Sequence, residues 1–309
     1  MRATEIDRQE TEKIKHILRY DYDQYESEAE QRKKKRILGK LGKIVIEWIQ
    51  LCGRKLDKDD ETIINSGGKI FTFGSYRKGV NGPGSDIDTL VVAPRHIDRD
   101  KHFFGELPDI LRKTPGVKEL TEVREAQVPV IKMKFEDVDI DMLFARVQLK
   151  EVGNDLELLH DDILRNCDIE TIRSLNGCRV TEQTLAIVKE NLDEFQTTLL
   201  CIKLWAKSRG LHSNVMGYLG GIGWAILTAK VCSDNPQMAP NQLLNRFFEY
   251  YRDYEWGPEN PLTLCEIAND AKTVKFDIPQ DLLYTPDPKA LMPIITPAFP
   301  CMNSTYNVS

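Results

Sequence analysis

The chain has 309 residues, of which 41% are hydrophobic and 29% are charged. This length exceeds what one domain usually holds, and the composition excludes a disordered chain, a collagen-like fibre and a small disulfide-stapled fold. No apolar run reaches the roughly 18 residues that a membrane-spanning helix needs, and residues 1–15 lack the apolar core of a signal peptide. We therefore expect two domains in a protein that is neither exported nor embedded in a membrane.

The seven cysteines and the net charge of −6 restrict the function further. No two cysteines form a C-x-x-C pair, which argues against a zinc ribbon or a redox dithiol and favours reduced thiols in the cytosol or nucleus. The negative charge argues against coating of nucleic acid by electrostatics alone, although a nucleic-acid end can still be held in a local cleft.

A helix is predicted from Ser27 to about Cys52. Ser27 and Glu30 fit a capping box, and apolar residues then recur at helical spacing. The basic run at residues 32–36 lies in this helix, and we interpret it as a solvated helix face rather than a nuclear-import signal.

Strands rich in β-branched and aromatic residues are predicted at residues 69–75, 87–93, 128–135 and 138–145. Glu136 and Asp137, between the last two strands, suit a tight hairpin turn. One helical segment, around residues 101–113, intervenes among these strands. The pattern therefore predicts a mixed α/β sheet rather than a regular parallel βαβ series.

After about residue 181 the pattern becomes helical, with helices predicted at residues 195–209, 222–232 and 241–251. The predicted fold class is α/β plus all-α, a mixed-sheet module followed by a helical domain. We divide the chain into N-terminal helices that pack on the modules, a sheet-containing module and a helical module, at residues 1–52, 53–180 and 181–309.

A pair of acidic residues, Asp86 and Asp88, lies two residues apart on a predicted strand, so both carboxylates project from one face. Convergent carboxylates repel each other, and a cation between them keeps both ionised. Ligation by oxygen alone selects a hard ion, Mg²⁺ or Mn²⁺. The pair by itself is a weak signal, because it also fits a solvated strand face.

Two further features strengthen the metal-site interpretation. Gly74 and Ser75 end the preceding strand, where a glycine lets a phosphate approach the backbone and N–H and hydroxyl groups bind its oxygens; the alternative is an ordinary turn. Asp139 and Asp141 lie in an otherwise apolar strand, and Asp141, deeper in the run, is the better third ligand. Three carboxylates and a triphosphate can hold two metal ions, which predicts nucleotidyl transfer by in-line displacement with release of pyrophosphate.

The helical module offers counter-charges for such a substrate. Lys203 and Lys207 are one turn apart and either neutralise a triphosphate or lie on the surface as ordinary lysines. Gly217, Gly220 and Gly221 precede a predicted helix, where they either admit a nucleotide close to the backbone or only turn the chain.

The chain contains, in this order, the segments FTFGSYRKGVNGPGSDIDTLVV, VPVIKMKF, IDMLFARV, SLNGCRVT, IKLWAKSRG, GYLGGIGWAIL and MPIITPAFPCMNSTYN. From about residue 30 to the last residue, these segments resemble eukaryotic poly(A) polymerases, which belong to the polymerase-beta-like nucleotidyltransferase superfamily. The resemblance implies a nucleotidyltransferase catalytic domain at residues 53–180 and a helical central domain at residues 181–309. It also implies that the RNA-binding domain that follows in this family is absent from this chain.

The resemblance implies transfer of AMP from ATP to the 3′-hydroxyl of RNA, that is, mRNA polyadenylation, with two Mg²⁺ or Mn²⁺ ions. The implied partners are ATP, the RNA 3′ end and cleavage and polyadenylation factors, and the implied location is the nucleus, with the cytoplasm as a second location. The alternatives are another terminal nucleotidyltransferase, such as a uridylyltransferase, and a non-catalytic processing adaptor. Intact Asp86, Asp88 and Asp141 speak against the adaptor.

Residue by residue, the resemblance implies that the catalytic, metal-binding residues are Asp86, Asp88 and Asp141. Together with the spacing of the lysines, it gives the expected ATP-binding residues as Phe73, Gly74, Ser75, Gly82, Asn176, Lys203, Lys207, His212, Asn214, Gly221, Ile222 and Thr296. The expected RNA-binding residues are Lys132 and Asn307. His212 stands where the family usually has tyrosine, which shortens the reach of this nucleotide contact and adds pH dependence near neutrality.

Overall fold

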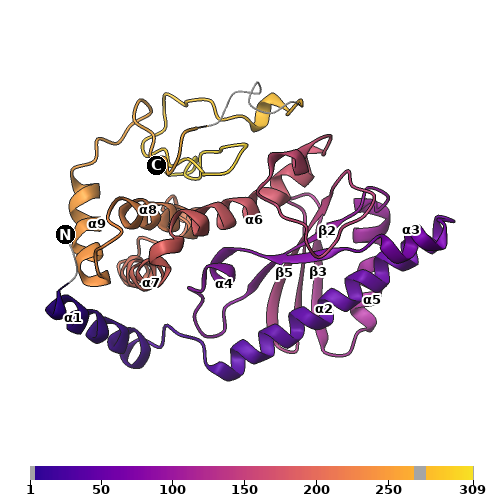
Figure 1. The fold of residues 1–309 in the computed structure, drawn as a ribbon, viewed down its shortest axis with the longest axis horizontal. Helices are drawn as coiled ribbons and strands as arrows, with labels where there is room; N and C mark the ends of the chain where they lie inside the picture. Colours follow the sequence, from indigo (N-terminus) through magenta and orange to yellow (C-terminus); the bar gives the residue numbers. More distant parts are fainter. Residues whose placement is uncertain (1–3, 268–275, 309) are drawn as a thin grey trace.

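A mixed sheet of five strands forms the centre of the first half of the molecule (Figure 1). The computed structural model describes residues 4–267 and 276–308. The strand order is β1-β2-β5-β4-β3, with β2 and β5 parallel and the other neighbours antiparallel. The strands are β1 (Lys69–Thr72), β2 (Ile87–Ala93), β3 (Val117–Val123), β4 (Val130–Phe135) and β5 (Val138–Arg146). The predicted mixed α/β class is therefore confirmed.

The sheet differs from the prediction in two places. The first strand ends at Thr72 rather than at residue 75, because Gly74 adopts a left-handed φ of 65° and begins the short helix α4 (Gly74–Lys78). Strand β3 was not predicted, because it lies at the sheet edge and none of its residues is fully buried. The predicted hairpin turn is present, with φ values of 48° at Glu136 and 62° at Asp137.

One face of the sheet is covered by α2 (Glu28–Lys55), which lies along the lower side of the sheet in Figure 1. Its N-terminus is the predicted capping box: the Ser27 hydroxyl accepts from the Glu30 N–H, and the Glu30 carboxylate accepts from the Ser27 N–H. The apolar stripe of α2 packs against residues of β2 and β5 in a common core, among them Leu41, Val45, Trp48, Val91 and Phe144. The short helices α3 (Asp60–Asn65) and α5 (Leu107–Lys113) and a π-helix (Arg99–Glu106) complete this side.

The other face of the sheet packs on α6 (Ile169–Ile187), which also contacts the helical half. Leu90 and Val92 of β2 share a core with Ile172 and Leu175 of α6. The sequence pattern did not predict α6, because this helix buries polar residues such as Ser174 and Thr181 together with its apolar ones and so lacks a single stripe. It crosses the predicted domain boundary at residues 180–181, and the domain division stays a prediction.

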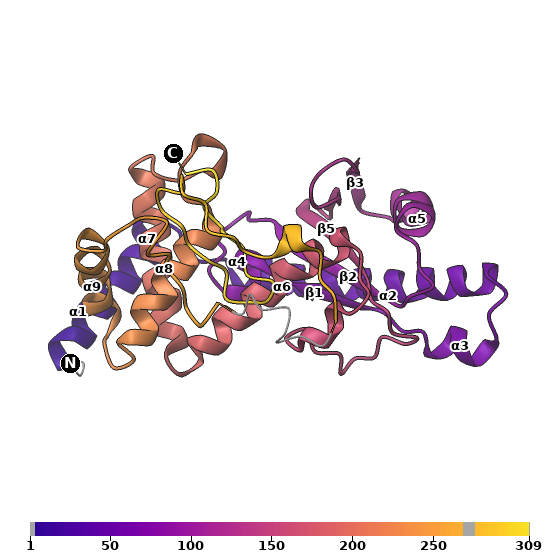
Figure 2. The ribbon, with the colours of Figure 1, turned by 90° about the horizontal axis from the view of Figure 1, so that it is seen from above.

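The second half of the molecule consists of helices around a separate core (Figure 2). The helices predicted at residues 195–209, 222–232 and 241–251 correspond to α7 (Leu192–Ser208), α8 (Gly221–Asp234) and α9 (Pro240–Arg252). The N-terminal helix α1 (Glu5–His16) is one of the helices expected within residues 1–52, although its bounds were not predicted, and it lies beside α9 in both views. The predicted order, a sheet-containing module followed by a helical domain, is therefore confirmed.

Single turns and loops connect these elements. They include a π-helical turn (Ile17–Asp21) and 3₁₀ turns at Asp161–Leu164, Lys189–Asn191, Asn214–Met216 and Gln280–Leu282. Residues 276–308 run back over α6, where the Arg179 Nε and Nη2 donate to the Phe299 carbonyl at 3.3 and 3.1 Å (Figure 1). Within the described ranges, every helix is too short or too polar to span a lipid bilayer.

Candidate active site

Three carboxylates meet at one end of the parallel strand pair. Asp88 on β2 lies directly opposite Asp141 on β5 in the strand register, and Asp86 immediately precedes β2. One oxygen of each of Asp86, Asp88 and Asp141 lies within 4.8 Å of the others. Because oxygens at this separation can share a hard divalent cation, the donor set fits such an ion. Asp139, the weaker candidate from the sequence, lies outside the cluster and is exposed.

The burial of Asp88 beside two other acids makes its ionised form costly without a cation. Burial, followed by the negative charges of Asp86 and Asp141, raises the pKa of Asp88 to about 6 from 3.8, although Lys78 and Lys132 partly oppose the rise. The Lys132 ammonium lies 2.5 Å from Asp141 Oδ2, and Lys132 is the cross-strand partner of Asp141 on β4. A half-exposed lysine, Lys132, which the family resemblance implies to be an RNA contact, therefore pairs with the cluster.

Gly74 closes one side of the cluster. A Cβ atom at this position would lie 2.1 Å from Asp88 Oδ2, and the φ of +65° also disfavours any side chain. The Phe73 N–H donates to the Asp88 carbonyl at 3.1 Å, and the Gly74 N–H donates to the Thr181 hydroxyl of α6 at 3.4 Å. The backbone of the Gly-Ser turn is thus fixed against both the carboxylate strand and α6.

A cavity of about 410 Å³ opens between this turn and the helices α6, α7 and α8. Cavities of this size are typical of small-molecule sites. Its lining includes eight of the residues that the sequence predicted for metal or ATP, namely Phe73, Gly74, Ser75, Asp88, Lys203, His212, Gly221 and Ile222. The predicted turn and the predicted helical residues, more than a hundred positions apart in the chain, therefore surround one cavity.

Two lysines line the cavity, and the sequence pointed to one of them. Lys203 Nζ donates to the Val80 carbonyl at 2.7 Å, and burial lowers its pKa, which the charge of Asp86 partly restores. Lys78, the last residue of α4, is only 8% exposed and was missed, because the Arg-Lys pair at residues 77–78 reads as surface charge. The signal that could have found it is its spacing of three residues from Ser75, which places both on one face of a helix.

The remaining predicted nucleotide residues are not part of the cavity lining. Lys207 is exposed at the end of α7, and Gly82 lies in the loop before β2, near the Gln24 carbonyl. Asn176 and Thr296 both contact Met302. The Asn176 amide nitrogen lies 3.6 Å from the Met302 sulfur, and the Thr296 hydroxyl accepts a hydrogen bond from the Met302 N–H at 2.9 Å.

Asn214 and Asn307 contact each other, since the Asn307 amide donates to the Asn214 carbonyl. This contact joins the C-terminal segment to the 3₁₀ turn before α8, whose first residues line the cavity. Asn176 Oδ1 and Asn307 Oδ1 are buried and lack a hydrogen-bond partner among the described residues.

The lysine of a buried ion pair hydrogen-bonds to Ser85, the residue before Asp86. Lys34 of α2 pairs with Glu26, both side chains being 3% exposed, and its ammonium also donates to the Ser85 carbonyl at 2.5 Å and the Ser85 hydroxyl at 3.0 Å. The interpretation of residues 32–36 as a wholly solvated face is therefore wrong at Lys34. Helix α2 consequently fixes the loop that presents Asp86.

Two models of one protein family match nearly the whole chain. The model of the poly(A) polymerase nucleotidyltransferase domain matches residues 1–188, and that of the poly(A) polymerase central domain matches residues 194–309. Nuclear poly(A) polymerase 1 of Arabidopsis thaliana is 45% identical over 306 residues, which are 99% of this chain and 42% of that protein. The poly(A) polymerase of Dictyostelium discoideum is 46% identical over 291 residues, 93% of this chain and 35% of that protein. The chain thus spans about two fifths of the length of these relatives.

Solved structures share the fold at low sequence identity. The Cid1 poly(U) polymerase with Mg 3′-dATP bound has a TM-score of 0.59 and 16% identity, covering 97% of this chain and 88% of that one. The polymerase core of TRAMP, an RNA surveillance complex, has a TM-score of 0.52 and 18% identity, covering 99% and 83%. Since the family models match both halves and the matched carboxylates converge beside a cavity, the chain belongs to the poly(A) polymerase family.

Proposed function

We propose that this chain transfers AMP from ATP to the 3′-hydroxyl end of RNA, as a polynucleotide adenylyltransferase. The single observation that carries the proposal is the convergence of Asp86, Asp88 and Asp141 within 4.8 Å, since acids brought together from two strands are costly without a cationic ligand. Membership of the poly(A) polymerase family supports ATP and RNA as the substrates.

The chain's own residues have separable tasks in this reaction. Asp86, Asp88 and Asp141 would hold Mg²⁺ or Mn²⁺, and two such ions, when bound, lower the pKa of the attacking hydroxyl and neutralise charge on the leaving group. The Gly74–Ser75 turn and Lys203 would bind and orient the triphosphate. The bond from the RNA O3′ to the α-phosphorus forms as the bond from the α-phosphorus to the pyrophosphate oxygen breaks. The RNA therefore grows by one AMP, and pyrophosphate is released.

The other residues that the sequence predicted have roles in nucleotide and RNA binding in this proposal. Gly82, Asn176, Lys207, Asn214 and Thr296 would contact or support the nucleotide around the cavity's rim, and His212, Gly221 and Ile222 would contact it from the cavity wall. Lys132, which pairs with Asp141, and Asn307 would contact the RNA 3′ end. We also keep the division into N-terminal helices, catalytic domain and central domain at residues 1–52, 53–180 and 181–309 as part of this proposal.

The relatives' names support a cellular setting. Three of the matched Arabidopsis proteins are named nuclear poly(A) polymerases, which supports a nuclear location for this chain, with the cytoplasm as a second location. Cleavage and polyadenylation factors are the partners that such a location implies. Pull-down of these factors from a nuclear extract, compared with the same chain unfolded, tests this part of the proposal.

Primer extension tests the activity itself. The chain is incubated with a labelled RNA primer, Mg²⁺ or Mn²⁺ and each of the four nucleoside triphosphates in turn, and we expect extension with ATP far above the other three. The Asp141→Asn variant should lose extension, whereas Asp139→Asn, an exposed acid on the same strand, should keep it. Equal use of all four nucleotides contradicts adenylyl selectivity, and an active Asp141→Asn variant contradicts the metal assignment.

A further inference from the structure

Lys78 is a buried ammonium for which the described fold supplies no partner. It ends α4, is 8% exposed and lines the same cavity as Asp88 and Lys203. Within residues 4–267 and 276–308, no hydrogen bond or ion pair engages its Nζ, whereas Lys203 Nζ donates to the Val80 carbonyl. A buried charge without a partner is destabilising, so a bound anion accounts for this ammonium better than the fold does.

The Lys78 ammonium is close enough to Lys203 and to Asp88 for the charge of each to affect its pKa. Burial, together with repulsion by Lys203, lowers the pKa of Lys78 to about 8, and the negative charge of Asp88 acts in the opposite direction. Both of these neighbours line the cavity. An anion that enters the cavity therefore meets two ammonium groups, one on α4 and one on α7.

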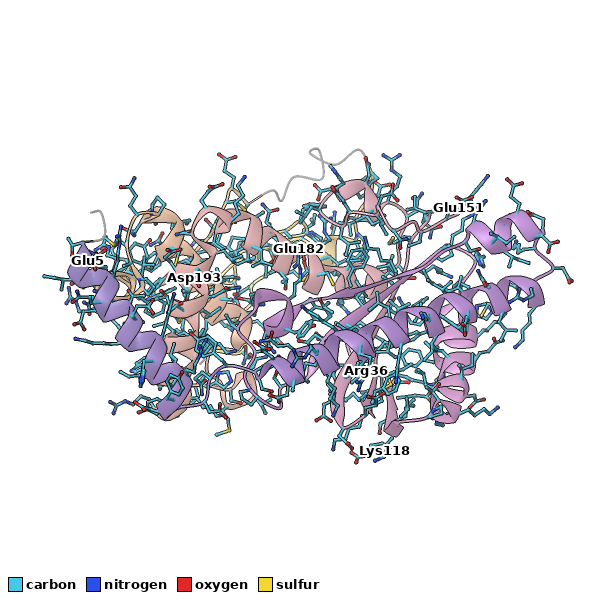
Figure 3. The ribbon with its side chains drawn as sticks, turned by 60° about the horizontal axis from the view of Figure 1, so that its bottom comes forward. Glu5, Arg36, Lys118, Glu151, Glu182 and Asp193 are labelled. Atoms are coloured by element: carbon cyan, nitrogen blue, oxygen red, sulfur yellow. The ribbon has the colours of Figure 1, made fainter. Side chains whose placement is uncertain are left out.

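The backbone of α4 is anchored without help from the Lys78 side chain. The adjacent Arg77 forms a two-pronged ion pair with Glu182 of α6, with N–O distances of 2.5 and 2.9 Å; Figure 3 labels Glu182. The Lys78 carbonyl accepts a hydrogen bond from the Gln196 amide of α7 at 2.9 Å. These contacts fix the helix that carries Lys78, and the burial of its side chain limits the space the ammonium can occupy, which favours ligand binding at a low ordering cost.

We propose that Lys78 is a second cationic contact for the polyphosphate chain of the nucleotide, acting together with Lys203, which lines the same cavity. The inference rests on the proposed function for the identity of the anion as a nucleoside triphosphate. The two lysines neutralise polyphosphate charge that the carboxylate-bound cations leave uncompensated, and they favour the separated pyrophosphate as its bond to the α-phosphorus breaks.

Binding measurements on Lys78→Met and Lys78→Arg test this role. Calorimetry in Mg²⁺ with ATP, inorganic tripolyphosphate and adenosine should show about a ten- to hundredfold loss for the first two ligands in Lys78→Met and unchanged adenosine binding. Lys78→Arg, which keeps the charge, should keep most of the affinity. The matched control is Lys113→Met, an exposed lysine that likewise ends a short helix, and it should bind all three ligands as the unmodified chain does.

Thermal unfolding of the ligand-free variants separates binding from a structural role. Removal of an unpartnered buried charge should leave the melting temperature of Lys78→Met equal to or above that of the unmodified chain. A lower melting temperature together with weaker adenosine binding, or unchanged tripolyphosphate binding, overturns the inference. Loss of RNA affinity alone, with ATP affinity unchanged, also overturns it and assigns Lys78 to the RNA phosphates.

The two proposals fail in different ways. If the unmodified chain does not extend RNA but its tripolyphosphate affinity still depends on Lys78, adenylyl transfer is refuted and the polyphosphate contact stands. If the unmodified chain extends RNA and Lys78→Met leaves the KM for ATP unchanged, the polyphosphate contact is refuted and adenylyl transfer stands.

Discussion

Replacement of Asp88 by asparagine is expected to stabilise the metal-free protein while it abolishes activity. The pKa of Asp88 is raised to about 6 in the fold from an ordinary value of 3.8, mainly by burial. At pH 7 the ionised carboxylate therefore destabilises the fold by up to about 3 kcal/mol, at 1.36 kcal/mol for each pKa unit. Because the folded pKa is the higher one, this penalty is absent below about pH 4, grows as the pH rises toward 6 and is complete above it.

Urea unfolding in EDTA at pH 4 and pH 7 measures this difference. We expect Asp88→Asn and the unmodified chain to have similar free energies of unfolding at pH 4, and the variant to be more stable at pH 7. Added Mg²⁺ should stabilise the unmodified chain and not the variant. Asp139→Asn, which alters an exposed acid outside the cluster, should behave as the unmodified chain does in each condition. A variant that is less stable at pH 7 in EDTA would show that the fold already pairs the Asp88 carboxylate favourably, and the reasoning would be refuted.

Three other substitutions probe the surroundings of the cluster. Gly74→Ala should lower primer extension about hundredfold, because its Cβ would meet Asp88 Oδ2 at 2.1 Å, and it should lower stability by about 1–2 kcal/mol for the left-handed φ. Lys34→Met should destabilise the fold by about 3–5 kcal/mol in urea, since it leaves Glu26 buried and unpaired, while Lys35→Met on the exposed face should not. Lys132→Met should lower the Mg²⁺ concentration for half-maximal activity by up to about fivefold, because the ammonium no longer competes for the carboxylate, and should weaken RNA binding in a filter assay. The first prediction is wrong if Gly74→Ala extends RNA as the unmodified chain does. The second is wrong if Lys34→Met keeps its stability, and the third if Lys132→Met keeps its Mg²⁺ requirement.

The parts of the fold that could be predicted are those whose burial is one-sided. Helix α2 has one apolar stripe on the sheet, and the β4–β5 hairpin has a two-residue turn of acidic residues that tolerate positive φ. Helix α6 could not be predicted from its pattern, because it is covered by the sheet on one side and by α8 on another. Burial on several sides removes the periodic contrast between apolar and polar residues on which the prediction depends.

The candidate site divides in the same way. The spacing of Asp86 and Asp88 on one strand face is a local property, and the apolar surroundings of Asp141 mark it as unusual, so the sequence could point to all three. The contribution of Lys34 and Lys78 depends on packing across long sequence separations: Lys34 meets the loop before β2, and Lys78 lies against α7 and β2. Both lysines stand in basic runs, where composition favours a solvated side chain over a buried one.

The charges of the site are arranged to remain available to ligands. Among the described residues, Asp88 and Lys78 form no ion pair with each other although both line the cavity, and burial disfavours the charged form of each. An ion pair between them would stabilise the empty fold, yet it would compete with a cation for the carboxylate and with a phosphate for the ammonium. The pair that the fold does form, Lys132 with Asp141, lies at the half-exposed rim, where exposed pairs contribute little and exchange easily. The fold by itself therefore gives up stability at these buried positions, and ligands of opposite charge would restore it on binding.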